Sequence, residues 1–378
     1  MKKFLIVAHY SRFLVQFEMN NVKILQEMGY EVHYATNYQQ EDMYADAPQK
    51  IRDAGVVLHQ IDFVRSPYRI PDNVKAYNQL VDLMKKIKFS GVHCHTPMAG
   101  VLSRLAAKAT DTKPVLYTAH GFHFYKGCPV QNRLIYETAE RFMARYTDAL
   151  ITINEEDYQA AKNFRLRGQA YKIPGVGVDT VEIEKTEIDI CSKRKELGIN
   201  QQAFVIMSTG ELNGNKNHET AIKALAKANI DNCYYIICGE GENRSKLIRL
   251  AKTAAVDDKV LFLGFREDVK EILKSADLFV FPSMREGLGL AAIEALAAGL
   301  PVIAAKNRGS LEYYQKDAVE LFEAQDYERL CAKILKWKNI LKNEQKRKEI
   351  SLVAQKQARN FDCKVVMEKM KRIYTGVQ

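Results

Sequence analysis

The sequence lacks a hydrophobic run long enough to cross a membrane. A transmembrane helix needs about 18 apolar residues without charges or helix breakers, and no stretch of the 378 residues provides them. The opening segment, MKKFLIVAHYSR, has two lysines and a short apolar run that is followed by His9, Tyr10 and Arg12. We interpret this segment as a first strand rather than a signal peptide, and we expect a cytoplasmic protein.

The sequence also lacks the short motifs of disulfide frameworks and metal centres. Its seven cysteines are scattered, and none forms a C-x-x-C pair. This usage is typical of free, mostly structural thiols in a reducing compartment. The sequence shows no D-x-D motif, metal-ligand cluster, short-period repeat or low-complexity tract. We therefore expect no cofactor and no required metal ion.

Positive charge is in excess, because 56 Lys and Arg residues stand against 46 Asp and Glu residues. A net charge of +10 favours an anionic partner, which could be a nucleic acid, a membrane surface or a phosphorylated substrate. A protein that binds nucleic acid would need aromatic side chains interleaved with cations on one face. Only residues 122–126 have that look. The length suggests about two domains.

The most informative stretch is PSMREGLGLAAIEALAAGLPVIAA, residues 282–305. The pattern predicts a buried strand at Leu278–Phe281, a glycine turn, a helix at Leu290–Ala298 and a second strand at Val302–Ala305. Such a crossover places the two strands parallel in one sheet. The turn lies where the helix begins, so free N–H groups and the helix dipole favour an anion such as phosphate.

Two carboxylates, Glu286 and Glu294, bracket this turn eight positions apart. A fully helical spacing would separate them by roughly 12 Å along the axis. This suits a nucleotide sugar, which has hydroxyls at both ends and a diphosphate between them. Glu286 could instead be an ordinary acid at a helix start, and Glu294 a solvated helix residue. We favour the ligand because an acid among the apolar neighbours of Glu294 is costly unless it is paired.

The E-x7-E pattern in REGLGLAAIEALAAGLPVIA resembles the donor site of the retaining family 4 glycosyltransferases, and the resemblance extends over nearly the whole chain. It implies an α/β protein of the GT-B fold, with two Rossmann-like domains facing each other across a cleft. We expect an acceptor domain at 1–178, a nucleotide-sugar domain at 179–360, and a C-terminal helix within 361–378 that crosses back to the first domain. The segment PGVGVD, residues 174–179, is the expected linker.

The resemblance also implies roles for individual residues. His120 would lie beside the transferred sugar, Glu286 would position that sugar, and Lys216 would neutralise the leaving diphosphate. Glu294 would bind the ribose, and backbone amides after the glycines would hold the diphosphate. Glu211 stands where the family usually has an arginine, which puts the phosphate clamp in doubt. The expected catalytic residues are His120, Glu286 and Lys216, and the expected donor-binding residues are Glu294, Gly287, Leu288, Gly289, Leu290, Ala291, Glu211, Gly239, Phe265 and Arg266.

The segment HGFHFYKG resembles bacterial transferases that build exopolysaccharides and capsules. This implies a UDP-sugar donor, with N-acetylhexosamine as the leading sugar, and a polyprenyl-diphosphate-linked or oligosaccharide acceptor at the inner membrane face. The aromatic cluster Phe122, Phe124 and Tyr125 could form a lid over the acceptor, an apolar edge that touches the membrane, or core beneath a loop. The residues that could meet the acceptor are Ser11, Arg12, Arg65 and His123.

Two alternative functions remain open at this point. A UDP-sugar 2-epimerase of the same fold would convert its donor without an acceptor. A basic nucleic-acid-binding protein would use the positive charge instead of the glycine turn. The acids Glu286 and Glu294 together with Lys216 favour a working sugar-nucleotide enzyme.

Overall fold

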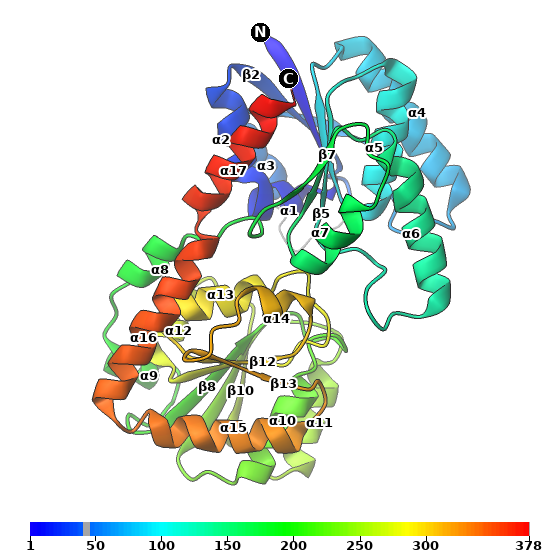
Figure 1. The fold of residues 1–378 in the computed structure, drawn as a ribbon. Coiled ribbons are helices and arrows are strands. Elements are labelled where there is room, and N and C mark those ends of the chain that lie inside the picture. Colours follow the sequence, from blue (N-terminus) through cyan, green and yellow to red (C-terminus); the bar gives the residue numbers. More distant parts are fainter. Residues whose placement is uncertain (41–45, 378) are drawn as a thin grey trace. The chain divides into compact units, whose positions relative to one another are not determined.

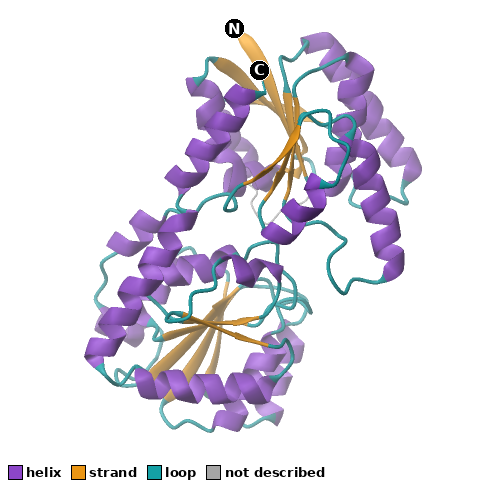
Figure 2. Cartoon of the chain, in the orientation of Figure 1, coloured by secondary structure: helices purple, strands orange, loops and turns teal. Residues whose placement is uncertain are grey.

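The computed structural model describes residues 1–40 and 46–377, and it divides into two compact units. The first unit contains Met1–Gly177 together with the C-terminal segment that begins at Cys363, and the second contains Val178–Asp362. Each unit is a parallel sheet with helices on both faces (Figures 1 and 2). The α/β prediction with two Rossmann-like domains is confirmed.

The first unit has a sheet of seven parallel strands in the order β3-β2-β1-β4-β5-β6-β7. The chain starts in the middle, winds to one edge, and returns to continue toward the other edge. Ligands of such sheets bind beyond the carboxyl ends of the strands, at the point where the winding reverses, which here lies between β1 and β4. The strands are β1 Lys2–Tyr10, β2 Tyr30–Asn37, β3 Val57–Gln60, β4 Val92–His95, β5 Val115–Ala119, β6 Ala149–Thr152 and β7 Gln169–Lys172.

The helix after β1 is not regular along its whole length. It begins as α1 (Ser11–Phe13), passes through the π-helical segment η1 (Leu14–Glu18), and continues as α2 (Met19–Glu27). The sequence predicted one helix from about Phe13 and did not reveal the π-helical turn. The other helices of this unit are α3 Ala47–Asp53, α4 Ile70–Ile87, α5 Pro97–Thr110, α6 Val130–Ala144, α7 Glu155–Lys162 and α17 Cys363–Gly376.

The C-terminal helix α17 belongs to the first unit, as predicted. It packs beside α2 (Figure 1). Tyr374 on α17 lies edge-on to Phe4 of β1, with ring centroids 5.7 Å apart. The Tyr374 hydroxyl also lies 2.7 Å from Nδ1 of the buried His93 on β4. These contacts fix the last helix against the sheet that carries the residues of interest.

The second unit has six parallel strands in the order β10-β9-β8-β11-β12-β13. The predicted crossover is confirmed, because β11 and β12 pair in parallel with Phe279 opposite Val302. The strands are β8 Phe204–Thr209, β9 Cys233–Cys238, β10 Val260–Gly264, β11 Leu278–Phe281, β12 Val302–Ala305 and β13 Val319–Phe322. The helices are α8 Thr180–Lys185, α9 Ile190–Glu196, α10 His218–Ala228, α11 Arg244–Thr253, α12 Val269–Ser275, α13 Leu290–Ala297, α14 Arg308–Glu312, α15 Tyr327–Ile340 and α16 Glu344–Ala358, followed by the 3₁₀ turn η2 Arg359–Phe361.

Continuous apolar runs form the central strands of both sheets. Residues 5–8 of β1 and 278–281 of β11 are almost fully buried, as expected where helices cover both faces. In the described part of the chain, no helix combines the length and the apolar character that a membrane span requires.

Candidate functional site

The turn between β11 and α13 needs glycine at position 289. Gly289 has φ of 98°, and a Cβ atom there would lie 2.7 Å from the Phe281 ring. A side chain would therefore meet both backbone strain and a steric clash. The glycine lets the chain turn tightly into α13, whose first N–H groups have no partners within the helix. These groups and the helix dipole give the turn a positive potential.

Lys216 and Glu286 form an ion pair beside this turn, with 2.6 Å between Nζ and Oε1. Both side chains are partly exposed, and the ammonium lies 5.2 Å from the centre of the Phe281 ring. Two hydrogen bonds tie the two loops together. The Met284 N–H donates to the Asn215 carbonyl at 2.8 Å, and the Asn215 amide donates to the Arg285 carbonyl at 2.9 Å. The structure thus joins a cation and a carboxylate that are 70 positions apart.

Glu294 lies on α13, which begins only at Leu290, whereas Glu286 lies in the turn before this helix. The segment between the two acids is therefore helical only in its second half. Its neighbours Ile293 and Ala295 are fully buried, while Glu294 itself keeps some exposure. Desolvation by these surroundings raises the pKa of its carboxyl, and the ammonium of Lys270 opposes the shift. A carboxyl in this setting gains most from hydrogen-bond donors such as hydroxyl groups.

Three glycines bring the ends of β8, β9 and β10 together. The Gly210 N–H donates to the Cys238 carbonyl at 3.0 Å, and the Gly239 N–H donates to the Gly264 carbonyl at 2.7 Å. A Cβ atom on Gly239 would lie 2.0 Å from the Gly210 carbonyl oxygen. Backbone packing is therefore enough to require glycine at 239. Glu211, next along the chain, is exposed to solvent.

The other predicted donor-binding residues differ in how accessible they are to a ligand. Arg266 donates to Asp268 at 2.6 Å and to Glu196 at 2.8 Å, so two carboxylates already compensate its charge. Phe265 is half exposed and can offer a flat apolar surface. Among the remaining predicted donor residues, Leu288 is buried, and the partly exposed ones are Gly287, Leu290 and Ala291.

In the first unit, His120 lies at the end of β5 as predicted, next to two residues that the sequence analysis did not select. Its Nε2 is 3.2 Å from Nδ1 of His95, at the end of β4, and 3.9 Å from Oε1 of Glu18, at the end of η1. Oε1 of Glu18 lies 3.4 Å from Nδ1 of His95. Burial lowers the pKa of His120 to about 4 and raises the pKa of Glu18 to about 8.

The sequence contained a signal for this cluster. Glu18 stands between Phe17 and Met19 within an amphipathic pattern, and an acid in such a position is costly unless it is paired. Glu294 is an acid in a similar setting, between Ile293 and Ala295. His93 and His95 alternate on β4, and His93 has both ring nitrogens engaged, with Tyr374 and Thr118 at 2.7 Å each. His95 differs, because its Nε2 has no hydrogen-bond partner among the described residues.

Two of the predicted acceptor residues line one cavity of the first unit, and the other two lie on α1. Arg65 and His123 line a mostly apolar cavity of about 390 Å³, together with Tyr10. The guanidinium groups of Arg65 and Arg12 lie 4.6 and 5.3 Å from the centre of the Tyr10 ring. Ser11 is buried at the start of α1. The structure therefore places Arg12 and Arg65 beside the Tyr10 ring, and it places His123 in the wall of the cavity that this ring also lines.

The aromatic cluster after His120 is core. Phe122 and Phe124 are 3% and 6% exposed, and their rings stack 4.7 Å apart beside Phe164. Of the three interpretations of this cluster, core beneath a loop is the one that holds for both phenylalanines. Their use as a membrane-touching edge or as a stacking surface for nucleic-acid bases was wrong, because buried rings cannot perform either role.

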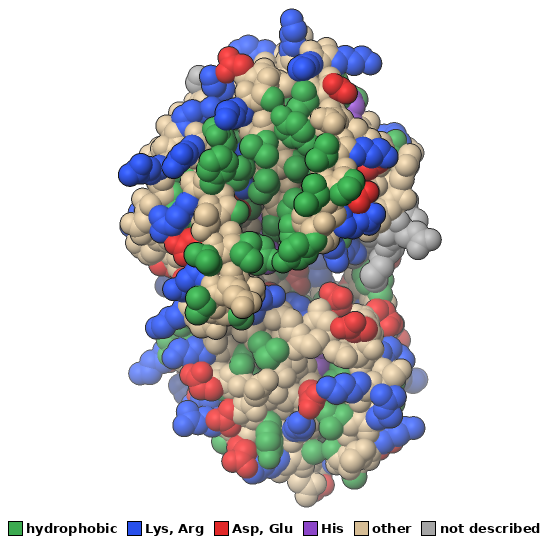
Figure 3. Space-filling view, turned by 90° about the vertical axis from the view of Figure 1, so that its right-hand side faces the viewer, with side chains coloured by type: hydrophobic (Ala, Val, Ile, Leu, Met, Phe, Trp, Pro, Cys, Tyr) green, Lys and Arg blue, Asp and Glu red, His purple; other side chains and the backbone are tan. Residues whose placement is uncertain are grey.

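The exposed apolar surface of the first unit lies elsewhere. Figure 3 shows hydrophobic side chains gathered on one face of this unit, with lysines and arginines around them. A second cavity, of about 550 Å³, opens between α4 and α5. We call the exposed hydrophobic residues of α4, α6 and their flanking loops the apolar face; they are Tyr68, Ile70, Val74, Val130, Leu134, Ile135 and Phe142.

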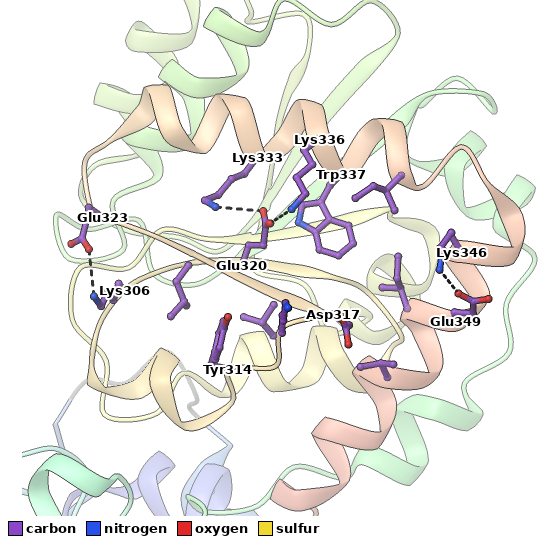
Figure 4. A pocket seen from close by; sticks show the side chains of 16 residues that line it. Lys306, Tyr314, Asp317, Glu320, Glu323, Lys333, Lys336, Trp337, Lys346 and Glu349 are labelled. Carbon is purple, nitrogen blue, oxygen red and sulfur yellow. Dashed lines mark hydrogen bonds and ion pairs between the residues drawn. The ribbon is translucent and has the colours of Figure 1, made fainter.

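A larger hollow of about 910 Å³ lies at the β13 edge of the second unit (Figure 4). Its charges compensate one another. Lys346 pairs with Glu349 at 2.7 Å, Lys306 lies 3.7 Å from Glu323, and Glu320 pairs with lysines of α15. None of the predicted site residues is among the described residues that line it. We interpret it as a surface groove that is unrelated to the glycine turn.

Comparison with known proteins identifies the family of the two units. Residues 4–154 match the family described as Glycosyl transferase 4-like, and residues 189–357 match Glycosyl transferases group 1. EpsD of Bacillus subtilis (strain 168), which bears the name of a glycosyltransferase, is 39% identical over 318 residues, covering 82% of this chain and 80% of EpsD. This relative supports the glycosyltransferase family that the E-x7-E pattern indicated.

Two further proteins extend this likeness. A UDP-Gal:alpha-D-GlcNAc-diphosphoundecaprenol alpha-1,3-galactosyltransferase of Escherichia coli is 32% identical over 244 residues, which is 63% of each chain. The crystal structure of HepE from Anabaena in complex with UDP and glucose superposes with a TM-score of 0.81 at 19% identity, covering all of both chains. At that identity, HepE supports the fold.

Proposed function

This chain belongs to the glycosyltransferases with a 4-like and a group 1 domain, and we propose that it moves a sugar from a UDP-sugar to a lipid-linked acceptor with retention of the anomeric configuration. The observation that carries this proposal is the arrangement around α13. A glycine turn at a helix start, Glu286 and the half-buried Glu294 lie within one loop–helix unit, and Lys216 from the loop before α10 pairs with Glu286. These groups match the diphosphate, the sugar and the ribose of the donor.

The N–H groups of the first two residues of α13 and the ammonium of Lys216 would stabilise the departing diphosphate. Negative charge develops on the β-phosphate oxygen as its bond to the anomeric carbon breaks, and preorganised donors lower the energy of that state. Glu286 pairs with the ammonium of Lys216. Donor binding would exchange this pair, so that Lys216 meets the diphosphate and Glu286 accepts hydroxyl groups of the sugar. We propose no metal ion for this step.

The acceptor would bind to the first unit. The Escherichia coli relative is named for an acceptor sugar on a diphosphoundecaprenol, and here an apolar cavity beside Arg65 adjoins the sheet's switch point. Apolar walls suit a polyprenyl chain, and arginine suits a diphosphate. The apolar face with its surrounding cations would contact the inner face of the membrane, where anionic lipids attract basic surfaces.

The test is an assay in detergent micelles with UDP-N-acetylglucosamine or UDP-galactose as donor and a polyprenyl-diphosphate-linked sugar as acceptor. We expect UDP release that requires the acceptor, and a product whose new linkage keeps the donor's anomeric configuration. Conversion of the donor without acceptor would instead identify a 2-epimerase. Failure to consume any UDP-sugar in the panel would contradict the proposal.

A further inference from the structure

Glu18, His95 and His120 converge in the first unit although they come from three separate segments. The three ligand-type atoms that face one another are Oε1 of Glu18, Nδ1 of His95 and Nε2 of His120. The distances between them are 3.2, 3.4 and 3.9 Å. Two imidazoles and one carboxylate are a donor set that proteins use for zinc and related divalent ions.

The three distances fit a single ion. They define a triangle whose circumcentre lies about 2 Å from every corner, which is the length of Zn–N and Zn–O bonds in proteins. One ion near the plane of the three atoms could therefore contact all of them without any rearrangement of the backbone. Three protein ligands leave a further position for water or another ligand.

A second group with the same residue types shows that composition alone does not give this geometry. His33 contacts Glu31 through Nε2 at 2.6 Å and His59 through Nδ1 at 2.8 Å. Because these two nitrogens point to different sides of the ring, the three residues form a chain. Their ligand atoms do not surround a common point. This linear group of Glu31, His33 and His59 provides a control for unspecific metal binding by histidine.

Burial and charge also favour a cation in the first cluster. Glu18 and His95 are 1% and 0% exposed, whereas the His120 side chain is 25% exposed and leaves a route from solvent. Within the described residues, the ion pairs of Glu18 are those with His95 and His120. A buried carboxylate without a positive partner is costly, and a divalent ion would supply that charge. Glu18 also closes a π-helical turn, a feature common at functional sites.

We propose that Glu18, His95 and His120 bind one divalent transition-metal ion of the zinc class in the first unit. The glycine turn and the donor-binding residues of the second unit take no part in this site. Loading would occupy Nε2 of His120 and fix its ring. This effect on activity rests on the proposed function: if His120 lies beside the transferred sugar, as the family resemblance implies, zinc would modulate transfer.

The experiment measures zinc binding by the full-length protein after treatment with a chelator. Calorimetric titration with Zn²⁺ is expected to show one tight site and a raised melting temperature. Glu18→Gln, which keeps the side-chain shape, and His120→Asn should each weaken zinc binding by at least about tenfold. Two control variants should bind zinc like the wild type. They are His59→Asn, in the linear group with His33 and Glu31, and His123→Asn, which is close to His120 in the sequence.

Two results would overturn the proposal. Wild-type protein that binds no zinc would mean that the three residues form a hydrogen-bonded group only. Zinc binding that is unchanged in both Glu18→Gln and His120→Asn would place the ion elsewhere. A UDP-induced rise in melting temperature, measured on the same variants, shows that they are folded and reports separately on the donor site of the second unit. Zinc binding and donor binding can thus fail independently.

Discussion

The two units place different kinds of chemistry at the carboxyl ends of very similar sheets. In the second unit, Lys216 and Glu286 are partly exposed and paired at 2.6 Å, next to backbone N–H groups that face no helical partner. In the first unit, Glu18, His95 and His120 are packed among buried side chains, and burial disfavours the charged form of each. The second unit is thus suited to stabilise negative charge that arrives with a ligand, whereas the first unit keeps its titratable groups neutral unless a cation compensates the Glu18 carboxylate.

Lys216→Ala should break this comparison most strongly, because it removes the cation from the charge-stabilising unit. Loss of one preorganised group at a developing negative charge lowers turnover by roughly a hundredfold to a thousandfold. Steady-state transfer with a UDP-sugar measures the effect. Lys223→Ala, a lysine on α10 that pairs with Glu219, is the matched control and should keep wild-type turnover. Equal losses in the two variants would contradict the role of Lys216.

Gly289→Ala tests whether the backbone of the turn, rather than its side chains, makes the anion site. The added Cβ would lie 2.7 Å from Phe281 in a residue with φ of 98°. We expect a stability loss of about 1–3 kcal/mol and loss of UDP binding, measured by melting temperature with and without UDP. Gly214→Ala is the control, since a Cβ there meets no described atom within 4 Å. If Gly289→Ala still binds UDP, the backbone of this turn is not the anion site.

Leu134→Glu tests the apolar face of the first unit, which we propose contacts the membrane. Leu134 is 70% exposed on α6. Replacing it with a charge should weaken binding to vesicles of anionic lipid by about tenfold, since burial of a leucine side chain contributes about 1.5–3 kcal/mol. Sedimentation with vesicles measures this. Leu352→Glu, at a leucine that is 67% exposed on α16, should bind vesicles like the wild type. Similar behaviour of both variants would exclude the apolar face as the contact.

Glu294→Gln gives the smallest effect, and the size of its effect on stability depends on pH. The folded chain raises the pKa of this carboxyl, so the unfolded chain releases the proton at a lower pH than the folded chain does. The folded state is therefore penalised as pH rises above the ordinary carboxyl value. The variant should be more stable than the wild type at neutral pH and equally stable well below that value. Denaturant midpoints of both proteins across this range test it, and a difference that does not depend on pH would contradict it.

The contrast between the units also explains what the sequence could reveal. The donor turn is built from contiguous residues, and its strands, its helix start at Leu290 and the bounds of β11 and β12 were predicted correctly. Glycine spacing and apolar runs record such local geometry. Lys216 was selected through the family pattern, and the structure shows that it lies beside Glu286, a contact that the sequence did not predict. The roles of these residues in binding and catalysis stay predictions.

The first-unit cluster was missed because tertiary packing assembles it. Nothing in the spacing of Glu18, His95 and His120 shows that three strand and helix ends will bring their side chains together. The same limit applies to Phe122 and Phe124, whose burial depends on Phe164 at the end of a later helix. The helix α14 and the edge strand β13 were also missed, because the five residues of α14 are too few for a helical period and Glu320 interrupts the apolar run of β13.

The measurement that tests the central claim most directly is the melting temperature of the wild type and of Glu294→Ala with UDP, UDP-sugars and a short oligonucleotide. A ligand that binds the folded chain raises its melting temperature by mass action. We predict a rise with UDP and at least one UDP-sugar, no rise with the oligonucleotide, and loss of the UDP effect in Glu294→Ala. A rise with the oligonucleotide alone, or a UDP effect that is unchanged in Glu294→Ala, would contradict the assignment of the donor site to the second unit.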